Sequence, residues 1–381
     1  SYVTLIMLHT EYLPSHWAHV RPMPDCRPMT GLREDSLETE AKNALPVVAV
    51  AMGDPSGISP ELTARILAEP DLRSAARYVV FGDFRLFQLG AADAGLTPDL
   101  HVVKEGDALP AAAGKPVFVD LANHDPADLQ RGKATLAGGK AATDNFRRAL
   151  QLAAAGKADA VFFTPFNKAA MRFAYPAYDD EIRFVRDAIG FDGAASEFNI
   201  LDKLWNARVT SHIPLSEVAR NITQERILRA LTLADANLRA AGFNPPRIAV
   251  AGINPHAGDG GNFGRDEIET IEPAVKAAKA KGFTVEGPFP SDTVFLRAKN
   301  GDFDAVLTMY HDQGQIAMKL MGFDRGVTLI GGFPFPICTP AHGTAYEIAG
   351  KGIANLGASR AALALAIKMA RDGKEAARTA A

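Results

Sequence analysis

Three histidines of the chain end apolar runs in the same way. Apolar runs that begin at residues 208, 248 and 305 lead into His212, His256 and His311. In an open parallel sheet, ligands bind beyond the carboxyl ends of the strands, so we expect the three histidines to converge on one place. Three imidazoles at one site suggest a divalent metal ion that keeps open coordination positions, which is the arrangement of a catalytic centre.

The spacing of the histidines does not establish this site. His256 follows His212 by 44 residues and precedes His311 by 55, which matches no local metal-binding motif. Taken singly, each histidine is more often a hydrogen-bonding loop residue than a ligand. The turn-forming, polar and small residues at 254–261 and 311–314 favour the metal interpretation, because such loops let the backbone approach a ligand.

The elements that must position these residues follow a regular rhythm from Leu45 onward. Strands are expected at 46–52, 78–81, 116–119, 160–163, 208–210, 247–251 and 305–309, and alanine-rich helices at 141–155, 224–241, 266–281 and 358–370. This alternation predicts an α/β fold with mostly parallel sheets and crossover helices. We expect two lobes with the active site in the cleft between them.

The expected lobe boundaries and the overall composition narrow the function further. Residues 45–180 and 340–381 are assigned to the nucleotide-side lobe, residues 181–339 to the metal and dimer side, and residues 1–44 to a disordered extension.

A net charge of −3 offers no basic field for nucleic acid or anionic lipid, and no apolar run approaches the roughly 20 residues that cross a bilayer. Only Cys26 and Cys338 are present, which indicates a reducing compartment, and we expect a cytoplasmic protein.

Two glycine-containing segments bear on nucleotide binding. The turn Gly53-Asp-Pro-Ser-Gly57 is neither the dinucleotide fingerprint nor a P-loop, so a standard Rossmann site is disfavoured. The segment 342–355 joins a small-residue turn to polar side chains, as a non-Rossmann adenosine pocket requires. By pattern alone, a helix start and a tight turn explain this segment more simply.

The chain resembles the 4-hydroxythreonine-4-phosphate dehydrogenase family, whose relatives are the isocitrate and isopropylmalate dehydrogenases, over residues 47–370. The motifs that carry the resemblance are Gly53-Asp-Pro-Ser-Gly-Ile-Ser-Pro-Glu, Ser211-His-Ile-Pro-Leu, Gly252-Ile-Asn-Pro-His-Ala-Gly-Asp-Gly-Gly, Gly287-Pro-Phe-Pro-Ser-Asp-Thr-Val-Phe, Tyr310-His-Asp-Gln-Gly and His342-Gly-Thr-Ala. The resemblance implies that both subunits of a homodimer contribute the metal ligands. It also implies an NAD pocket lined by His342, Gly343, Thr344, Ala345 and Asn355.

The reaction that the resemblance implies is oxidation of a secondary alcohol β to a carboxylate, followed by loss of carbon dioxide from the β-keto acid. The cofactors would be NAD, or NADP, and one divalent metal ion per site. Imidazole ligands favour zinc, cobalt, nickel or manganese, with magnesium a further candidate. Lys168, Asp292 and Asp312 are candidates for proton transfer or for orienting imidazoles. A surface salt bridge for the lysine and helix capping for the aspartates explain them about as well.

The pocket that would hold the substrate departs from the family. Where the family has a histidine and a threonine that contact a phosphorylated substrate, this chain has Glu181 and Ile182. A glutamate repels a phosphate, and isoleucine removes a hydroxyl donor. The family's lysine is retained as Lys319, whereas its asparagine and arginine are replaced. The expected substrate-binding residues are Glu181, Ile182, Arg183, Lys319, Thr328 and Ile337.

These departures predict a paralogue that acts on a different hydroxy acid. The apolar residues Phe333, Phe335 and Ile337 would suit an unphosphorylated cis-dihydrodiol of an aromatic carboxylic acid, with Arg183 or Arg325 binding its carboxylate. Another sugar-acid phosphate stays open because Lys319 remains. The alternative classes are a metal-dependent lyase or hydrolase without NAD, and a non-catalytic binding protein of the same fold.

Overall fold

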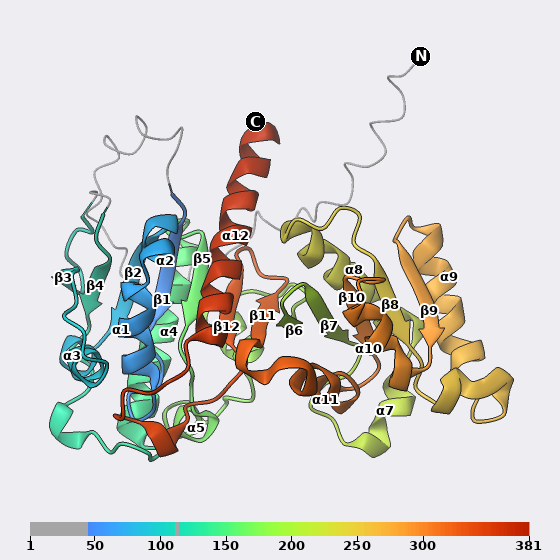
Figure 1. Ribbon diagram of the computed structural model, residues 1–381, viewed down its shortest axis with the longest axis horizontal. Coiled ribbons are helices and arrows are strands. Elements are labelled where there is room, and N and C mark those ends of the chain that lie inside the picture. The colour runs from blue at the N-terminus through green and yellow to red at the C-terminus, as the bar shows by residue number, and fades with distance from the viewer. Residues whose placement is uncertain (1–44, 111–113, 381) are drawn as a thin grey trace.

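The computed structural model describes residues 45–110 and 114–380, which form an α/β fold around one twelve-stranded sheet (Figure 1). The strand order is β3-β4-β2-β1-β5-β12-β11-β6-β7-β10-β8-β9. The expected extension, residues 1–44, lies outside the described residues. The prediction of an α/β fold with a large, mostly parallel sheet is confirmed.

The sheet contains two sets of parallel strands that meet at antiparallel pairs. Strands β3, β4, β2, β1, β5 and β12 form the first parallel set, and β7, β10, β8 and β9 form the second. Between them, β11 is antiparallel to β12 and β6, and β6 is antiparallel to β7. The strands are β1 Val47–Ala51, β2 Arg77–Gly82, β3 His101–Lys104, β4 Val117–Asp120, β5 Ala160–Phe163, β6 Ser196–Leu201, β7 Leu204–Arg208, β8 Ile248–Ala251, β9 Val285–Phe289, β10 Ala305–Thr308, β11 Val327–Gly331 and β12 Ile337–Pro340.

Several helices begin where a short polar side chain accepts a backbone N–H group, as Thr135 does for α4 and Asp180 for α6. In the described part of the chain, no helix is long and apolar enough to cross a membrane. The helices are α1 Ser59–Ala68, α2 Pro70–Ala75, α3 Phe84–Asp93, α4 Leu136–Ala154, α5 Lys168–Ala174, α6 Glu181–Ile189, α7 Leu215–Asn221, α8 Gln224–Ala240, α9 Glu272–Ala280, α10 Ser291–Lys299, α11 His311–Gly322 and α12 Gly357–Ala380, with a π-helical turn at Glu267–Ile271.

Helices cover both faces of the first parallel set. Val48 and Val50 of β1 belong to one hydrophobic cluster, which includes side chains of α1 and α12. Ala49 and Ala51 belong to a second cluster, which includes side chains of α4. Successive side chains of a strand point to opposite faces, so β1 is buried on both sides. This explains why its sequence is a continuous apolar run.

The predicted strand at residues 208–210 was wrong. The strand β7 ends at Arg208, and its apolar side chains Trp205 and Ala207 lie earlier and are buried. Asn206 interrupts the apolar pattern, which hid the strand in the sequence. It is nevertheless fully buried, because its side-chain amide donates to the carbonyl oxygen of Val306 in β10. The division into lobes at residues 45–180 with 340–381 and at 181–339 stays a prediction.

The crossing of α4 over α5 gives a test of the packing. A Cβ on Gly139 would lie 1.8 Å from the carbonyl oxygen of Ala170. We expect Gly139→Ala to lower the free energy of unfolding by roughly 1–3 kcal/mol, because the two helices cannot separate without opening the core. The matched control is Gly373→Ala in α12, where nothing lies within 4 Å of the new Cβ. This substitution should raise the free energy of unfolding by roughly 0.5–1 kcal/mol. Urea denaturation measures both, and equal effects would contradict this account of the packing.

Candidate active site

Three neighbouring parallel strands lead to the three histidines. Strand β10 pairs in parallel with β7 on one side and with β8 on the other. His212, His256 and His311 follow the carboxyl ends of these strands, so the predicted strand-end placement is confirmed. The rings of His212 and His311 face each other with centroids 5.7 Å apart. Their side chains are 47% and 38% exposed, which leaves them open to a ligand.

The backbone at two of the histidines is strained. His212 has a φ of 52° and His256 a φ of 53°. Both values lie in the left-handed region, which residues other than glycine rarely adopt. Such a conformation persists only where the surrounding structure enforces it, and it clusters at functional sites. The strain therefore points to a function for both loops.

His256 does not join the other two histidines within one chain. In residues 45–110 and 114–380, no group of three or more His, Cys, Asp and Glu side chains could hold a metal ion. The His256 ring lies instead 6.0 Å from the ring of Phe263. One subunit thus assembles a pair of imidazoles, and the three-histidine centre stays a prediction.

A carboxylate faces the Nδ1 atom of each paired histidine. His311 Nδ1 is 2.6 Å from Asp312 Oδ1, and His212 Nδ1 is 3.8 Å from Asp180 Oδ2. The interaction with His212 keeps the pKa of Asp180 below its usual value. With Nδ1 occupied in this way, the Nε2 atoms are the nitrogens left for a ligand. Asp312 is therefore at the site, whereas Asp292 lies exposed in the first turn of α10.

Lys168 lies between acidic side chains. It is the first residue of α5, which Asn167 caps by accepting the N–H of Ala170. Its Nζ is 3.7 Å from Glu181 Oε2, and the hydroxyl of the buried Tyr178 donates to Glu181 Oε1 at 2.9 Å. The structure thus brings together two residues that the sequence assigned to separate roles, proton transfer and substrate binding.

A buried polar layer on β6 and β7 adjoins this group. The Arg208 guanidinium bonds to Glu197 Oε2 at 2.9 Å and donates to Asn199 Oδ1 at 2.7 Å, and Thr328 Oγ1 is 3.5 Å from Asn199 Nδ2. Burial raises the pKa of Glu197, but Arg208 outweighs it and, with smaller contributions from Lys168 and His212, holds the pKa below its usual value. Glu197, Asn199 and Arg208 could not be recognised from the sequence pattern, because they lie within short strands.

The other predicted substrate residues are dispersed. Ile337 is fully buried in β12, where it packs in the hydrophobic core. Ile182 is partly buried against the same core cluster, and Lys319 lies exposed on α11. The two candidate arginines are engaged elsewhere on the surface: Arg183 pairs with Asp179, and Arg325 pairs with Asp202 and Asp324.

The predicted nucleotide segment packs on the turn that follows β1. The N–H of Ile58 donates to the carbonyl oxygen of Thr344 at 3.0 Å, and a Cβ on Gly57 would lie 2.6 Å from that oxygen. His342 Nδ1 is 3.0 Å from the carbonyl oxygen of Gly343, and His342 Nε2 is buried with no hydrogen-bond partner among the described residues. An orphaned nitrogen beside an open glycine suits a bound polar ligand.

The buried carboxylate of Asp54 ties these two segments together. Asp54 is fully buried, accepts the N–H of Ser56 at 2.9 Å, and accepts the Tyr346 hydroxyl at 2.5 Å. Burial raises the pKa of Asp54, and these hydrogen bonds offset the rise only in part. Nearby, Asn355 Oδ1 accepts the N–H of Gly357 at the start of α12, so Asn355 also has a capping role.

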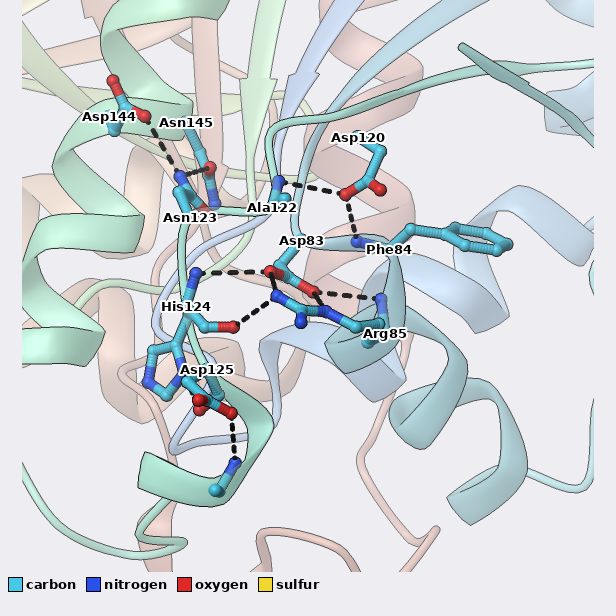
Figure 2. A network of polar contacts seen from close by, with 11 residues as sticks. Asp83, Phe84, Arg85, Asp120, Ala122, Asn123, His124, Asp125, Asp144 and Asn145 are labelled. Atoms are coloured by element: carbon cyan, nitrogen blue, oxygen red, sulfur yellow. Dashed lines mark hydrogen bonds and ion pairs between the residues drawn. The ribbon is translucent and has the colours of Figure 1, made fainter. Parts of the chain in front are cut away.

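The loops after β2 and β4 are fixed by a second network (Figure 2). The Asp83 carboxylate binds the Arg85 guanidinium and accepts the N–H of His124, and Arg85 also donates to the carbonyl oxygen of His124. His124 in turn lies close enough to Asp54 to lower its pKa. These two loops follow strands of the first set, and His124 links them electrostatically to the Asp54 turn that follows a third strand.

The fold is of the α/β class, and the site holds two neighbouring imidazoles with a carboxylate on the Nδ1 side of each. The chain belongs to the PdxA family, because the family model described as "Pyridoxal phosphate biosynthetic protein PdxA" matches residues 74–366. The family resemblance seen in the sequence is thereby confirmed. Relatives of this chain are named as dehydrogenases, so the chain is an oxidoreductase that acts on a CH–OH group.

Three relatives illustrate the range of the family. A protein from Rhizobium meliloti named "Putative 4-hydroxythreonine-4-phosphate dehydrogenase 2" is 63% identical over 87% of this chain and 95% of its own length. The 4-hydroxythreonine-4-phosphate dehydrogenase structure from Klebsiella pneumoniae is 35% identical, with a TM-score of 0.73 over 85% of this chain and 99% of that one. A terephthalate 1,2-cis-dihydrodiol dehydrogenase from Burkholderia xenovorans LB400 is 30% identical, with a TM-score of 0.59 over 85% and 98%.

The Tyr346–Asp54 hydrogen bond predicts a pH-dependent loss of stability. Tyr346→Phe removes a donor to a buried carboxylate, which should cost roughly 1–3 kcal/mol. Because the raised pKa of Asp54 means that burial disfavours its ionised form, stability is lost as the pH rises above the unfolded-state pKa. The hydroxyl partly relieves that loss, so we expect the variant to lose more stability at pH 7 than at pH 4.

Urea denaturation at the two pH values measures this effect. The matched control is Tyr175→Phe, because the Tyr175 hydroxyl donates to the exposed carboxylate of Asp187. The control should lose little stability at either pH. An equal loss at pH 4 and pH 7 in Tyr346→Phe would show that Asp54 does not depend on this hydroxyl.

Proposed function

We propose that the protein is an NAD- and divalent-metal-dependent dehydrogenase that oxidises a secondary alcohol of a hydroxy acid. The observation that carries the proposal is the facing pair His212 and His311, 5.7 Å apart at the ends of adjacent parallel strands, in a chain of the PdxA family. His212 and His311 of one subunit, together with His256 of the partner subunit, would hold the metal ion.

The donor set fits a divalent transition metal. Neutral imidazoles suit zinc, cobalt, nickel or manganese, and the carboxylates of Asp180 and Asp312 on the Nδ1 side orient the rings. When bound, such an ion supplies Lewis-acid chemistry, which withdraws electron density from an alcohol or carbonyl oxygen. The exposed Nε2 side of the pair leaves room for the substrate.

The segment around His342 fits a nicotinamide dinucleotide. With Nδ1 donating to the carbonyl oxygen of Gly343, His342 Nε2 is an acceptor, and it has no partner among residues 45–110 and 114–380. It would accept a hydrogen bond from the cofactor. His342, Gly343, Thr344, Ala345 and Asn355 would hold NAD or NADP. When bound, the nicotinamide supplies a hydride acceptor.

Lys168 is the proposed proton-transfer residue. Its Nζ lies 3.7 Å from Glu181 Oε2, and Lys168 is close enough to Asp180 to lower the pKa of that carboxyl. Its Nζ would bind the hydroxyl or carboxylate oxygens of the substrate and exchange a proton there. If the oxidised product is a β-keto acid that loses carbon dioxide, Lys168 is also the group that would return a proton to the product.

An exposed apolar face beside the histidine pair supports a homodimer. The helix α11 begins at His311 and presents Ile316 at 60% and Leu320 at 84% exposure, and Leu296 on α10 is 62% exposed. Large exposed apolar side chains of this kind mark interaction surfaces. A second subunit that covers this face would bring its own His256 within reach of His212 and His311.

For the substrate, we propose a phosphorylated hydroxy acid of the kind named for the relative from Rhizobium meliloti, which is 63% identical. One observation favours a second candidate, an unphosphorylated cis-dihydrodiol of an aromatic carboxylic acid. Glu181 lies 3.7 Å from Lys168, where its charge would repel a phosphate, and the dihydrodiol dehydrogenase from Burkholderia xenovorans LB400 shares the fold.

NAD reduction in the presence of added metal distinguishes the two substrates. If the substrate is phosphorylated, Glu181→Gln should lower the KM for that substrate several-fold, because a negative charge leaves the pocket. The control is Glu286→Gln, at an exposed position on β9, which should leave this KM unchanged. Turnover of a carboxylated dihydrodiol alone would favour the second candidate. No NAD reduction with any hydroxy acid would contradict the dehydrogenase and favour a lyase.

Subunit complementation tests the shared site. Co-expression of His212→Ala with His256→Ala should restore about one quarter of the wild-type rate, because half of the dimers are mixed and one of their two sites is intact. The control pair, His212→Ala with His311→Ala, should restore nothing, because both ligands come from the same subunit. If the first pair stays as inactive as its single variants, the site is not shared in this way.

A further inference from the structure

The loop that carries His256 has an unusual backbone. Five consecutive residues, 256–260, have positive φ values between 44° and 83°, and three of them are not glycine. A run of left-handed residues is costly, because each side chain crowds the backbone. Something outside the run must therefore hold the His256 loop in this shape.

The side chain that holds the loop is Glu267, in the π-helical turn that follows. Glu267 is 1% exposed. Its Oε1 accepts the N–H groups of Ile253 and Asn254, each at 2.8 Å, and its Oε2 accepts the Asn254 side-chain amide at 2.9 Å. No ion pair of Glu267 occurs in the described part of the chain. A buried carboxylate that is surrounded by N–H donors in this way makes strong, charge-assisted hydrogen bonds.

The loop is also shaped around this carboxylate. A Cβ on Gly252 would lie 2.9 Å from Glu267 Oε1, and a Cβ on Gly258 would lie 2.7 Å from Oε2. Gly252 and Gly258 lie on either side of His256 in the sequence. The two glycines thus allow the backbone on both sides of the histidine to close against Glu267.

A second side chain fixes the loop relative to His311. Gln313 donates from Nε2 to the carbonyl oxygen of Gly252 at 2.7 Å, and its Oε1 accepts the N–H of Met309 at 2.6 Å. Met309 follows β10 and lies two residues before His311. The start of the His256 loop is therefore held at a defined position beside the strand end that carries His311.

We propose that Glu267 is a positioning residue, which holds the His256 loop in its ligand-presenting shape before a metal ion binds. This rests on the proposed function, in which His256 is a metal ligand. Glu267 does not itself touch the ion in this account. Its hydrogen bonds act through the chain at Ile253 and Asn254, which lie three and two residues ahead of the histidine.

Binding of Co²⁺ to the metal-free dimer tests the proposal without turnover. Glu267→Gln keeps the size of the side chain but replaces one acceptor oxygen with a donor, so we expect Co²⁺ to bind about 10–100-fold more weakly. Glu267→Asp keeps the charge and should recover part of the affinity. Glu269→Gln, on the same turn, is the matched control and should bind as wild type, because Glu269 is exposed and its ion pair among the described residues is with Arg265.

Competition with a chelator gives the dissociation constants, and circular dichroism and size-exclusion chromatography establish that each variant is folded and dimeric. If Glu267→Gln does not fold, Asn254→Ala is the second variant. It removes the side-chain amide that donates to Glu267 and to Asp266 but leaves both backbone bonds to Glu267, so Co²⁺ should bind it several-fold more weakly. Wild-type affinity in a folded Glu267→Gln dimer, or in Asn254→Ala where the first variant is unfolded, would overturn the proposal.

His212→Ala and His256→Ala separate this proposal from the proposed function. Both should lose Co²⁺ binding if the metal site is as proposed. If they bind Co²⁺ like wild type, or if the wild type does not bind it, the metal site itself is wrong. If they lose the ion while Glu267→Gln retains it, only the positioning role of Glu267 fails.

Discussion

The parallel pairing of β10 with β7 and β8 is the constraint on which the candidate site depends. Because parallel strands end at the same edge, this pairing sets the loops of His212, His256 and His311 side by side, although the three residues are far apart in the sequence. The apolar side chains of these strands are buried, so the core that stabilises the fold also fixes the spacing of the histidine loops.

The second half of the site depends on contacts between distant segments. Asp54, after the first strand, bonds to Tyr346, near the end of the chain, and Thr344 bonds to Ile58. These contacts are possible because β12 pairs with β5 of the first parallel set and brings the chain back to it. The proposed nucleotide segment and the histidine pair therefore lie on different strand sets of one continuous sheet. Lys168 and His212 both lie close enough to Glu197 to lower the pKa of its carboxyl group.

The sequence predicted the fold class and the strand-end placement of the histidines because buried parallel strands are continuous apolar runs. It did not reveal Asp180, Glu197 or Arg208, since single polar residues in or beside short strands look like interruptions of the pattern. It also paired Ile337 with the substrate, because family correspondence gives a position in the chain and not the direction of a side chain, which is into the core. The left-handed backbone of the His256 loop and its hydrogen bonds to Glu267 are encoded in no periodicity.

The central claim is that two subunits share one metal centre. The most direct measurement is anomalous X-ray diffraction at the Co²⁺ absorption edge from crystals of the Co²⁺-loaded protein. The account predicts one peak per subunit, bounded by His212 and His311 of one subunit and by His256 of the partner subunit. A peak whose protein ligands all come from one chain, or a peak away from these histidines, would contradict it.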